Sequence, residues 1–197
     1  METPSLNIPK WKLSLLKTKY AARRIPVSKS SKTQSDTQQI QQKLPGFDQL
    51  KHVILYMSAY QFQRNRQVIL DFIDFLQKNN KNVHSIIVYQ TRDSKAVVND
   101  SGSDTTHLIL KDFNYYGVPK TEIAKKAVNR NADLFINLDP NGGLTMLGCA
   151  AEANAVHSVS PYQASYQSFF NILLKESKDD DLYQYICSIK SFFSHLS

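Results

Sequence analysis

Short apolar segments that alternate with amphipathic segments predict an α/β fold built on a mostly parallel sheet of five or six strands. The chain has 197 residues, of which 42% are hydrophobic, and this is enough for one ordinary core. The net charge of +7 is concentrated near the N-terminus. The sequence therefore predicts a basic amphipathic arm (residues 1–25), a flexible linker (26–46) and a single α/β domain (47–197).

The predicted strands are short runs rich in β-branched and aromatic residues. They are expected at residues 52–59, 83–89, 106–110, 133–138 and 155–159. Continuous apolar runs of this length are typical of strands that are buried on both faces of a parallel sheet. Residues 168–175 fit either an edge strand or a helix. We favour the strand, because Asp179–Asp181 then lie at the N-terminus of the last helix, where negative charge is favourable.

Helices are expected between these strands. Apolar residues recur at helical spacing over residues 63–79, Pro119 is suited to open a helix that runs to Val128, and a further helix is expected at Leu144–Asn154. Strands that alternate with helices in this way require right-handed crossovers that cover both faces of the sheet. The fold class that we predict is a three-layer Rossmann-like or flavodoxin-like domain.

The basic arm carries the whole excess of positive charge. Residues 1–32 contain eight lysines and arginines against the single acidic residue Glu2, whereas the remaining residues contain sixteen basic and sixteen acidic side chains. The arm residues that we expect to contact nucleic acid or an anionic surface are Lys10, Trp11, Lys12, Lys17, Lys19, Tyr20, Arg23 and Arg24. Cations that neutralise phosphates and aromatic rings that stack on bases are typical of RNA binding.

Our leading hypothesis is therefore a non-enzymatic cytoplasmic adaptor whose arm contacts RNA or a ribonucleoprotein. Trp, Leu and Lys on one helix also suit an anionic membrane surface, and a protein partner is a further alternative. The sequence has no apolar stretch of the roughly 18 residues that span a bilayer. It also lacks a continuous apolar signal segment near the N-terminus, and we expect a cytoplasmic location.

A second hypothesis places function at the carboxyl ends of the strands, where ligands bind in open α/β sheets. The candidate ligand-binding residues there are Ser58, Asp112, Asn114, Asp139, Asn141, Gly142 and Gly143, and Arg92 and Asp93 follow the second strand. Gly142 and Gly143 precede a predicted helix, whose first amides can face an anion. This predicts an enzyme or a binding protein for a phosphorylated metabolite or a nucleotide. An ordinary turn is the competing interpretation, because these residue types also cap helices and turns.

Several kinds of site lack support in the sequence. The first turn, Ser58–Gln67, contains no glycine, which argues against the GxGxxG and Walker loops.

Asp112 and Asp139 are candidates for a carboxylate pair that holds magnesium or exchanges protons. The histidines occur singly and suggest no triad; we expect those in strands to satisfy local hydrogen bonds. Cys149 and Cys187 lack zinc-site spacing and are expected as buried thiols. We predict no cofactor and no metal.

Three features carry a family resemblance: the basic arm, the segment KDFNYYGVPK (Lys111–Lys120), and ADLFINL (Ala132–Leu138) before an alanine-containing helix. Together they resemble an uncharacterised family of Bacteroidetes proteins, a domain of unknown function. The resemblance runs from about Lys12 to the end and implies a basic helix before a small Rossmann-like domain in a bacterial cytoplasm. It implies no reaction and no catalytic residues, and Asp139–Gly143 departs from the family pattern.

The passage from DLFINL through the following turn and helix is also similar, more weakly, to the acceptor half of heptosyltransferase-type glycosyltransferases. Those enzymes need a second Rossmann domain for the nucleotide sugar, and a single folded domain leaves no room for it. The similarity therefore implies a common architecture and no shared activity.

Overall fold

The computed structural model describes residue 14 and residues 46–91, 104–163, 166–174 and 181–194. Everything below concerns these residues. The predicted contacts of the basic arm and nearly all of the predicted linker lie outside them. In the described part of the chain, no helix has both the length and the apolar character needed to cross a membrane.

Six strands form one sheet in which every neighbouring pair is parallel. The strands are β1 (His52–Ser58), β2 (Asn82–Tyr89), β3 (Thr105–Ile109), β4 (Leu134–Asn137), β5 (His157–Pro161) and β6 (Ile172–Leu174). Their order across the sheet is β3-β2-β1-β4-β5-β6. The chain thus moves outward from β1 in one direction and then from β4 in the other, and the predicted Rossmann-like α/β fold is confirmed.

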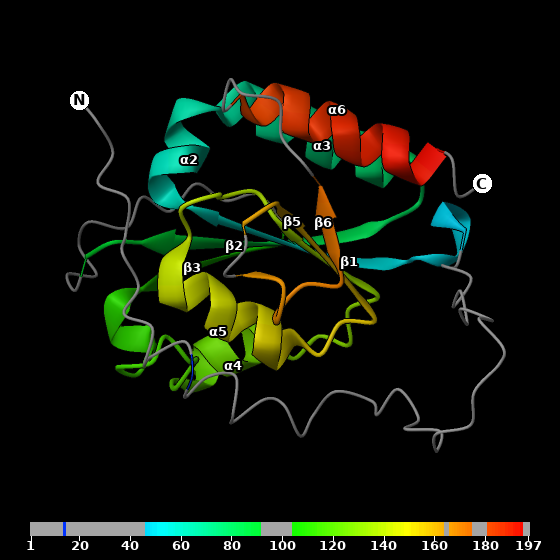
Figure 1. Cartoon of the computed structure of the whole chain (residues 1–197). Coiled ribbons are helices and arrows are strands. Elements are labelled where there is room, and N and C mark those ends of the chain that lie inside the picture. The colour runs from blue at the N-terminus through cyan, green and yellow to red at the C-terminus, as the bar shows by residue number, and fades with distance from the viewer. Residues whose placement is uncertain (1–13, 15–45, 92–103, 164–165, 175–180, 195–197) are drawn as a thin grey trace, which may run out of the picture.

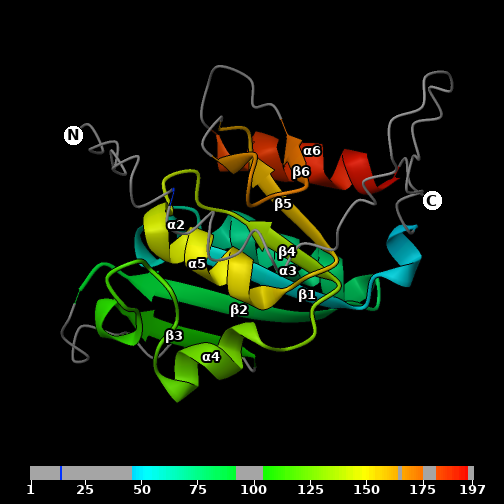
Figure 2. The same cartoon turned by 60° about the horizontal axis from the view of Figure 1, so that its bottom comes forward.

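Helices cover both faces of the sheet. They are α2 (Ala59–Arg64), α3 (Arg66–Lys78), α4 (Glu122–Val128), α5 (Gly143–Ala153) and α6 (Leu182–Ser194), with short 3-10 turns η1 (Phe47–Gln49) and η3 (Leu110–Asp112). Figure 1 shows α2, α3 and α6 above the sheet and α4 and α5 below it. Figure 2, turned to bring the lower layer forward, shows α4 beside β3 and α5 across the middle of the sheet.

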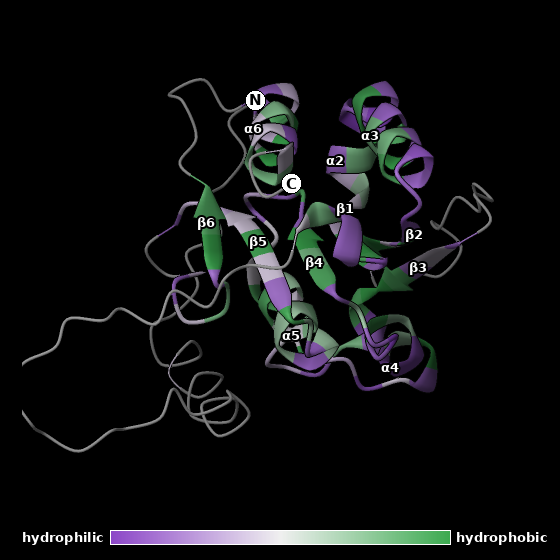
Figure 3. Cartoon of the chain, turned by 90° about the vertical axis from the view of Figure 1, so that its right-hand side faces the viewer, coloured by the Kyte–Doolittle hydropathy of each residue, from purple (hydrophilic) through white to green (hydrophobic). Residues whose placement is uncertain are grey.

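The sheet separates two apolar cores because side chains alternate along each strand. In β1, Ile54 and Tyr56 pack with α4 and α5, whereas Leu55 and Met57 pack with α3 and α6. Figure 3 shows β4 and β6 as hydrophobic, β5 as white to hydrophilic, and hydrophilic segments on α3 and α4. The burial of β1, β2 and β4 on both faces explains why the sequence shows them as continuous apolar runs.

The first helical region differs from the prediction of one helix over 63–79. The helix begins directly after β1, where the Ser58 hydroxyl accepts a hydrogen bond from the Gln61 amide at 3.2 Å, and it breaks at Asn65. The Asn65 side-chain amide donates to Gln61 Oε1 at 2.8 Å. A side chain that bonds back to the preceding turn competes with regular helical pairing, which accounts for the break.

The helix predicted to open at Pro119 begins later. Pro119 instead forms an antiparallel bridge with Phe113, and the helix starts after Thr121, whose hydroxyl accepts from the Ala124 amide at 3.3 Å. A threonine cap satisfies one of the free amides of the first turn. The sequence signal for the start was therefore Thr121, and the proline belongs to the preceding turn.

The C-terminal elements follow the prediction with shifted boundaries. The fifth strand lies at His157–Pro161, two residues later than expected, and the predicted strand over 168–175 is reduced to Ile172–Leu174. Asp181 accepts a hydrogen bond from the Tyr183 amide at 2.9 Å as α6 begins. Cys187 is exposed, so the prediction that both thiols are buried is wrong for this one. It lies on the solvent side of α6, opposite the face that packs on the sheet.

Candidate functional site

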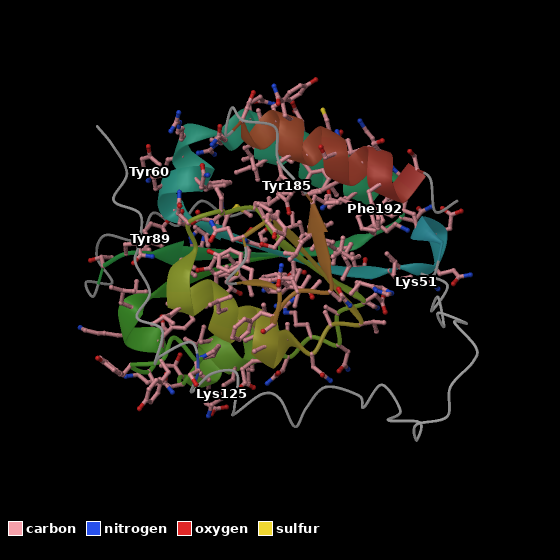
Figure 4. The ribbon with its side chains drawn as sticks, viewed as in Figure 1. Lys51, Tyr60, Tyr89, Lys125, Tyr185 and Phe192 are labelled. Atoms are coloured by element: carbon pink, nitrogen blue, oxygen red, sulfur yellow. The ribbon has the colours of Figure 1, made fainter. Side chains whose placement is uncertain are left out.

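The carboxyl edge of the sheet is the end at which all strands finish. Chain order reverses there between β1 and β4, which is where ligands bind in open α/β sheets. Figure 4 labels Tyr60 and Tyr89 at this end and Lys51 at the opposite end. Two of the predicted site residues, Ser58 at the end of β1 and Asp139 after β4, are brought into hydrogen-bonding contact at this point.

Asp139 is the most constrained polar side chain of this edge. It is 3% exposed, and its Oδ1 accepts a hydrogen bond from the Asn141 amide at 2.9 Å. Both the hydroxyl and the backbone amide of Ser58 also donate to the carboxylate. Burial raises the pKa of Asp139, and these hydrogen bonds oppose the rise only in part. The edge therefore contains a carboxyl group that takes up a proton more readily than an exposed aspartate.

The N-terminus of α5 lies directly after this carboxylate. No side chain caps the helix at Gly142, and a Cβ on Gly142 would lie 2.6 Å from Met146 Cβ, so this position is closed. Gly143 is different: its φ is +63°, and the place that a Cβ would occupy has no heavy atom within 4 Å. A left-handed glycine thus begins the helix with unfilled room beside its Cα, although the residue itself is buried.

Buried hydrogen bonds fix this helix start on the sheet. Tyr56 Oη, below α5, lies 2.8 Å from Thr145 Oγ1, and the Thr145 hydroxyl also lies 3.2 Å from the Gly142 carbonyl oxygen. The Pro140 carbonyl accepts from Gln163 Nε2 at 2.6 Å. These contacts rigidify the segment between β4 and α5.

The predicted carboxylate pair of Asp112 and Asp139 is not formed. Asp112 follows β3 and Asp139 follows β4, and β2 and β1 lie between them, which amounts to three strand spacings, or about 14 Å. Asp112 instead accepts hydrogen bonds from the Ile109 amide at 2.8 Å and the Thr121 hydroxyl at 2.9 Å. The prediction was wrong because the distance depends on strand order, which local sequence does not reveal.

Asn114 serves the turn that contains it. Its Oδ1 accepts hydrogen bonds from the amides of Tyr116 at 2.9 Å and Val118 at 3.1 Å, as expected for a turn-forming asparagine. Asn114 therefore acts as a turn-forming residue, in agreement with the competing interpretation of an ordinary turn. Arg92 and Asp93, expected after β2, lie outside the described residues.

Exposed tyrosines surround the carboxyl edge. They follow β1, β3 and β5, and they are Tyr60, Tyr115, Tyr116 and Tyr162. The turn that carries two of them packs against α5, because a Cβ on Gly117 would collide with the backbone of Leu144. Large aromatic side chains left in solvent on several loops of one edge form a surface on which planar or sugar-like groups can stack.

Sequence reasoning missed a second group of polar residues at the amino edge of the sheet. His84 Nδ1 in β2 lies 2.9 Å from Asp104 Oδ1, and Arg130 Nη1 donates to the same oxygen at 2.7 Å. These three residues line a cavity of about 390 Å³. The only sequence signal was a histidine within the apolar run VHSIIVY, since its partners lie 20 and 46 positions away.

Comparisons with known proteins place the chain in a family. Residues 21–196 match the model of the "Family of unknown function (DUF6913)", and the chain belongs to this family. No curated protein matches the sequence. Among solved structures, the chain is similar to a glycosyl transferase family 9 protein from Veillonella parvula DSM 2008, with 15% identity and a TM-score of 0.44. The match covers 72% of this chain and 41% of that protein.

Proposed function

We propose that this member of a family of unknown function binds a phosphorylated small molecule, of the nucleotide class, at the carboxyl edge of its sheet. The observation that supports this most is the N-terminus of α5, which has no side-chain cap among the described residues, begins at the buried Gly143 with room for a Cβ, and lies at the reversal of strand order. An uncapped helix start presents free amides and the positive end of the helix dipole, and phosphate groups bind there.

The surroundings of α5 favour a phosphate over an uncharged ligand. The amides of the first helical turn have no side-chain acceptor at the cap, so a ligand oxygen is their natural partner. Burial raises the pKa of Asp139, and a bound phosphate would raise it further, because a nearby anion favours the protonated carboxyl group. A protonated carboxyl group carries no charge and so does not repel the phosphate.

The exposed tyrosines favour a nucleotide over a simple sugar phosphate. Tyr115 and Tyr116 are in edge-to-face contact, with ring centroids 5.5 Å apart, and their turn packs on the helix that begins at Gly143. Tyrosine faces stack on nucleobases without strong sequence preference, at about 1–3 kcal/mol per base. A ligand that contacts both the N-terminus of α5 and the tyrosine-bearing turn therefore carries a phosphate at one end and a base at the other.

Calorimetric titration of the full chain with AMP and with ribose 5-phosphate tests the proposal. We expect both to bind, and AMP to bind more tightly because it adds the base. Gly143→Val fills the free space and abolishes binding of both. The matched control is Asn80→Val in the exposed turn before β2, whose φ of 59° imposes similar backbone strain far from the site. If neither compound binds the wild-type chain, or if both variants lose binding equally, the proposal is wrong.

Charge distribution favours a second candidate function, the cytoplasmic adaptor in which the basic arm binds RNA. The eight cations of residues 1–32 lie beside a remainder of the chain with no net charge. Each phosphate that the arm neutralises releases counterions, which makes binding steeply dependent on salt. This proposal is independent of the carboxyl edge.

Retention of a single-stranded RNA in a salt series tests the arm. Removal of residues 1–32 should abolish retention at low salt, while Gly143→Val leaves it intact. The same truncation is tested by sedimentation with anionic vesicles. Arm-dependent sedimentation without RNA retention would replace RNA with a membrane surface as the partner, and no binding to either would end the adaptor hypothesis.

A further inference from the structure

The cavity of about 390 Å³ lies at the amino edge of the sheet, under the turn that joins α4 to β4. Its polar lining comes from the starts of β1 and β2, the residue before β3 and that turn, and consists of His52, Asn82, His84, Asp104, Asn129, Arg130 and Asn131. The volume falls within the range of small-molecule sites. It is distinct from the carboxyl edge, because it lies at the opposite end of the same strands.

His84 gives this cavity a defined hydrogen-bonding character. Its Nδ1 lies 2.9 Å from Asp104 Oδ1, and since a carboxylate only accepts, Nδ1 carries the proton and Nε2 of the neutral ring is an acceptor. Nε2 is buried and has no hydrogen-bond partner in the structure. Burial lowers the pKa of His84, and the bond to Asp104 opposes this only in part. Nε2 is closed even to water, so the ring acts on a ligand through Nδ1, which holds Asp104 in place beside Arg130.

Arg130 supplies the complementary groups. Its Nη1 donates to Asp104 Oδ1 at 2.7 Å, and the side chains of this pair are each 44% exposed. No other acceptor for this guanidinium is found within the described ranges, so its remaining N–H groups can bind a ligand carboxylate in the planar, two-point geometry typical of arginine.

From this geometry we infer that the amino-edge cavity is a binding site for a polyhydroxylated monocarboxylate, that is, a sugar acid. Arg130 binds the carboxylate, and the amides of Asn82, Asn129 and Asn131 exchange hydrogen bonds with the hydroxyl groups. Asparagine amides both donate and accept, as hydroxyl groups do. Because Asp104 already neutralises much of the Arg130 charge, a monoanion suits the site better than a phosphate dianion.

A purely structural role does not account for these residues. The exposed pair of Asp104 and Arg130 contributes little to folding, and a buried imidazole nitrogen without a partner is unfavourable. Asn131 also holds a φ of 49°, a left-handed conformation, in the turn above the cavity. Strain and unsatisfied polar atoms that gather at one cavity are typical of binding sites.

The test is a titration of the uniformly ¹⁵N-labelled full chain with gluconate, following the ring nitrogens of His84 by NMR. The resonance is assigned by its loss in His84→Phe. Gluconate should shift Nδ1 with saturation, because Nδ1 shares the Asp104 Oδ1 acceptor with Arg130. Sorbitol, which lacks the carboxylate, and hexanoate, which lacks the hydroxyls, should bind at least about tenfold more weakly. Arg130→Gln should weaken gluconate binding by about tenfold or more.

The matched control is Lys125→Gln, which removes an equally exposed cation of α4 that pairs only with Glu122 at 3.1 Å. Figure 4 labels Lys125 on the outer side of that helix. Gluconate affinity should be unchanged in this variant and in Gly143→Val, which separates this site from the carboxyl edge. The inference is overturned if Nδ1 shows no saturable shift up to about 10 mM gluconate, if inorganic phosphate gives the same shift, or if Lys125→Gln weakens binding as Arg130→Gln does.

Discussion

The two edges of the sheet satisfy their polar groups in opposite ways. At the carboxyl edge, the Asp139 carboxylate accepts hydrogen bonds from Ser58 and Asn141, so the side chain is fully engaged. The free groups there are the first backbone amides of α5. At the amino edge, the backbone is paired by the strands, and the free groups are side-chain atoms, namely His84 Nε2 and the guanidinium of Arg130.

This difference indicates which kind of ligand each edge suits. Backbone amides at a helix start form a fixed array of donors that favours phosphate whatever the rest of the ligand is. Side chains around a cavity combine acceptors, donors and charge, and they select a ligand by its pattern of functional groups. The predictions below separate the two edges, beginning with the substitution that should disrupt one edge most and the other least.

Gly148→Ala should have the largest effect, and the effect should be confined to the carboxyl edge. A Cβ on Gly148 in α5 would collide with the backbone carbonyl of Gly117, which is main chain and cannot turn aside. We expect a loss of about 3 kcal/mol or more in the free energy of unfolding, although alanine in a helix normally stabilises by about 1 kcal/mol. Urea denaturation measures the loss. A stabilised variant would contradict the close contact between α5 and the tyrosine-bearing turn.

Tyr56→Phe should have an intermediate effect on the same edge. The substitution removes a buried hydrogen bond of 2.8 Å to Thr145, but the Thr145 hydroxyl keeps a contact with the Gly142 carbonyl. We therefore expect a loss of about 1 kcal/mol. AMP binding should weaken, because the start of α5 is less firmly held, while the gluconate-dependent shift of His84 should persist. If both ligands lose affinity equally, the two edges are not independent.

The amino edge should make stability depend on pH. Burial lowers the pKa values of His84 and His157, while Asp104 and Asp133 oppose the shifts only in part. Below the ordinary histidine value of 6.5, the unfolded chain binds protons that the folded chain does not. The free energy of unfolding should therefore fall as the pH falls through 6.5, until the folded imidazoles also take up protons.

Urea denaturation at a series of pH values measures this dependence. In His84→Phe the slope below pH 6.5 should be smaller, because one of the two depressed histidines is gone, and the residual slope belongs to His157. The variant also removes a buried nitrogen that lacks a partner, so its stability near neutral pH should not fall greatly. An unchanged slope would show that His84 is protonated as easily when folded as when unfolded.

The sequence was sufficient for the architecture and for part of one edge. Periodicity and turn residues placed the first five strands within one or two residues, because burial on both faces leaves continuous apolar runs such as HVILYM. Ser58, Asp139 and Gly143 could be placed at the carboxyl edge because each lies where a strand ends or a helix begins; that they bind a ligand stays a prediction. The Asp112 pairing failed and the amino-edge cavity was missed for the same reason. Both depend on which strands are neighbours, and strand order is a property of tertiary packing.

Asp139→Asn should have the smallest effect, with the sign opposite to that of the histidines. Burial raises the pKa of Asp139 above the ordinary value of 3.8, so its favourable contribution is fully present below that value and is lost as the pH rises through the folded pKa. Asparagine keeps the acceptor oxygen for Ser58 and Asn141 without the buried charge, so the variant should melt at a slightly higher temperature near neutral pH. Its advantage should shrink in acid, where the wild-type carboxyl group is protonated. A lower melting temperature across this range would mean that the hydrogen bonds to Asp139 outweigh its desolvation, and the carboxyl group would then be a fixed anion that disfavours phosphate at the start of α5.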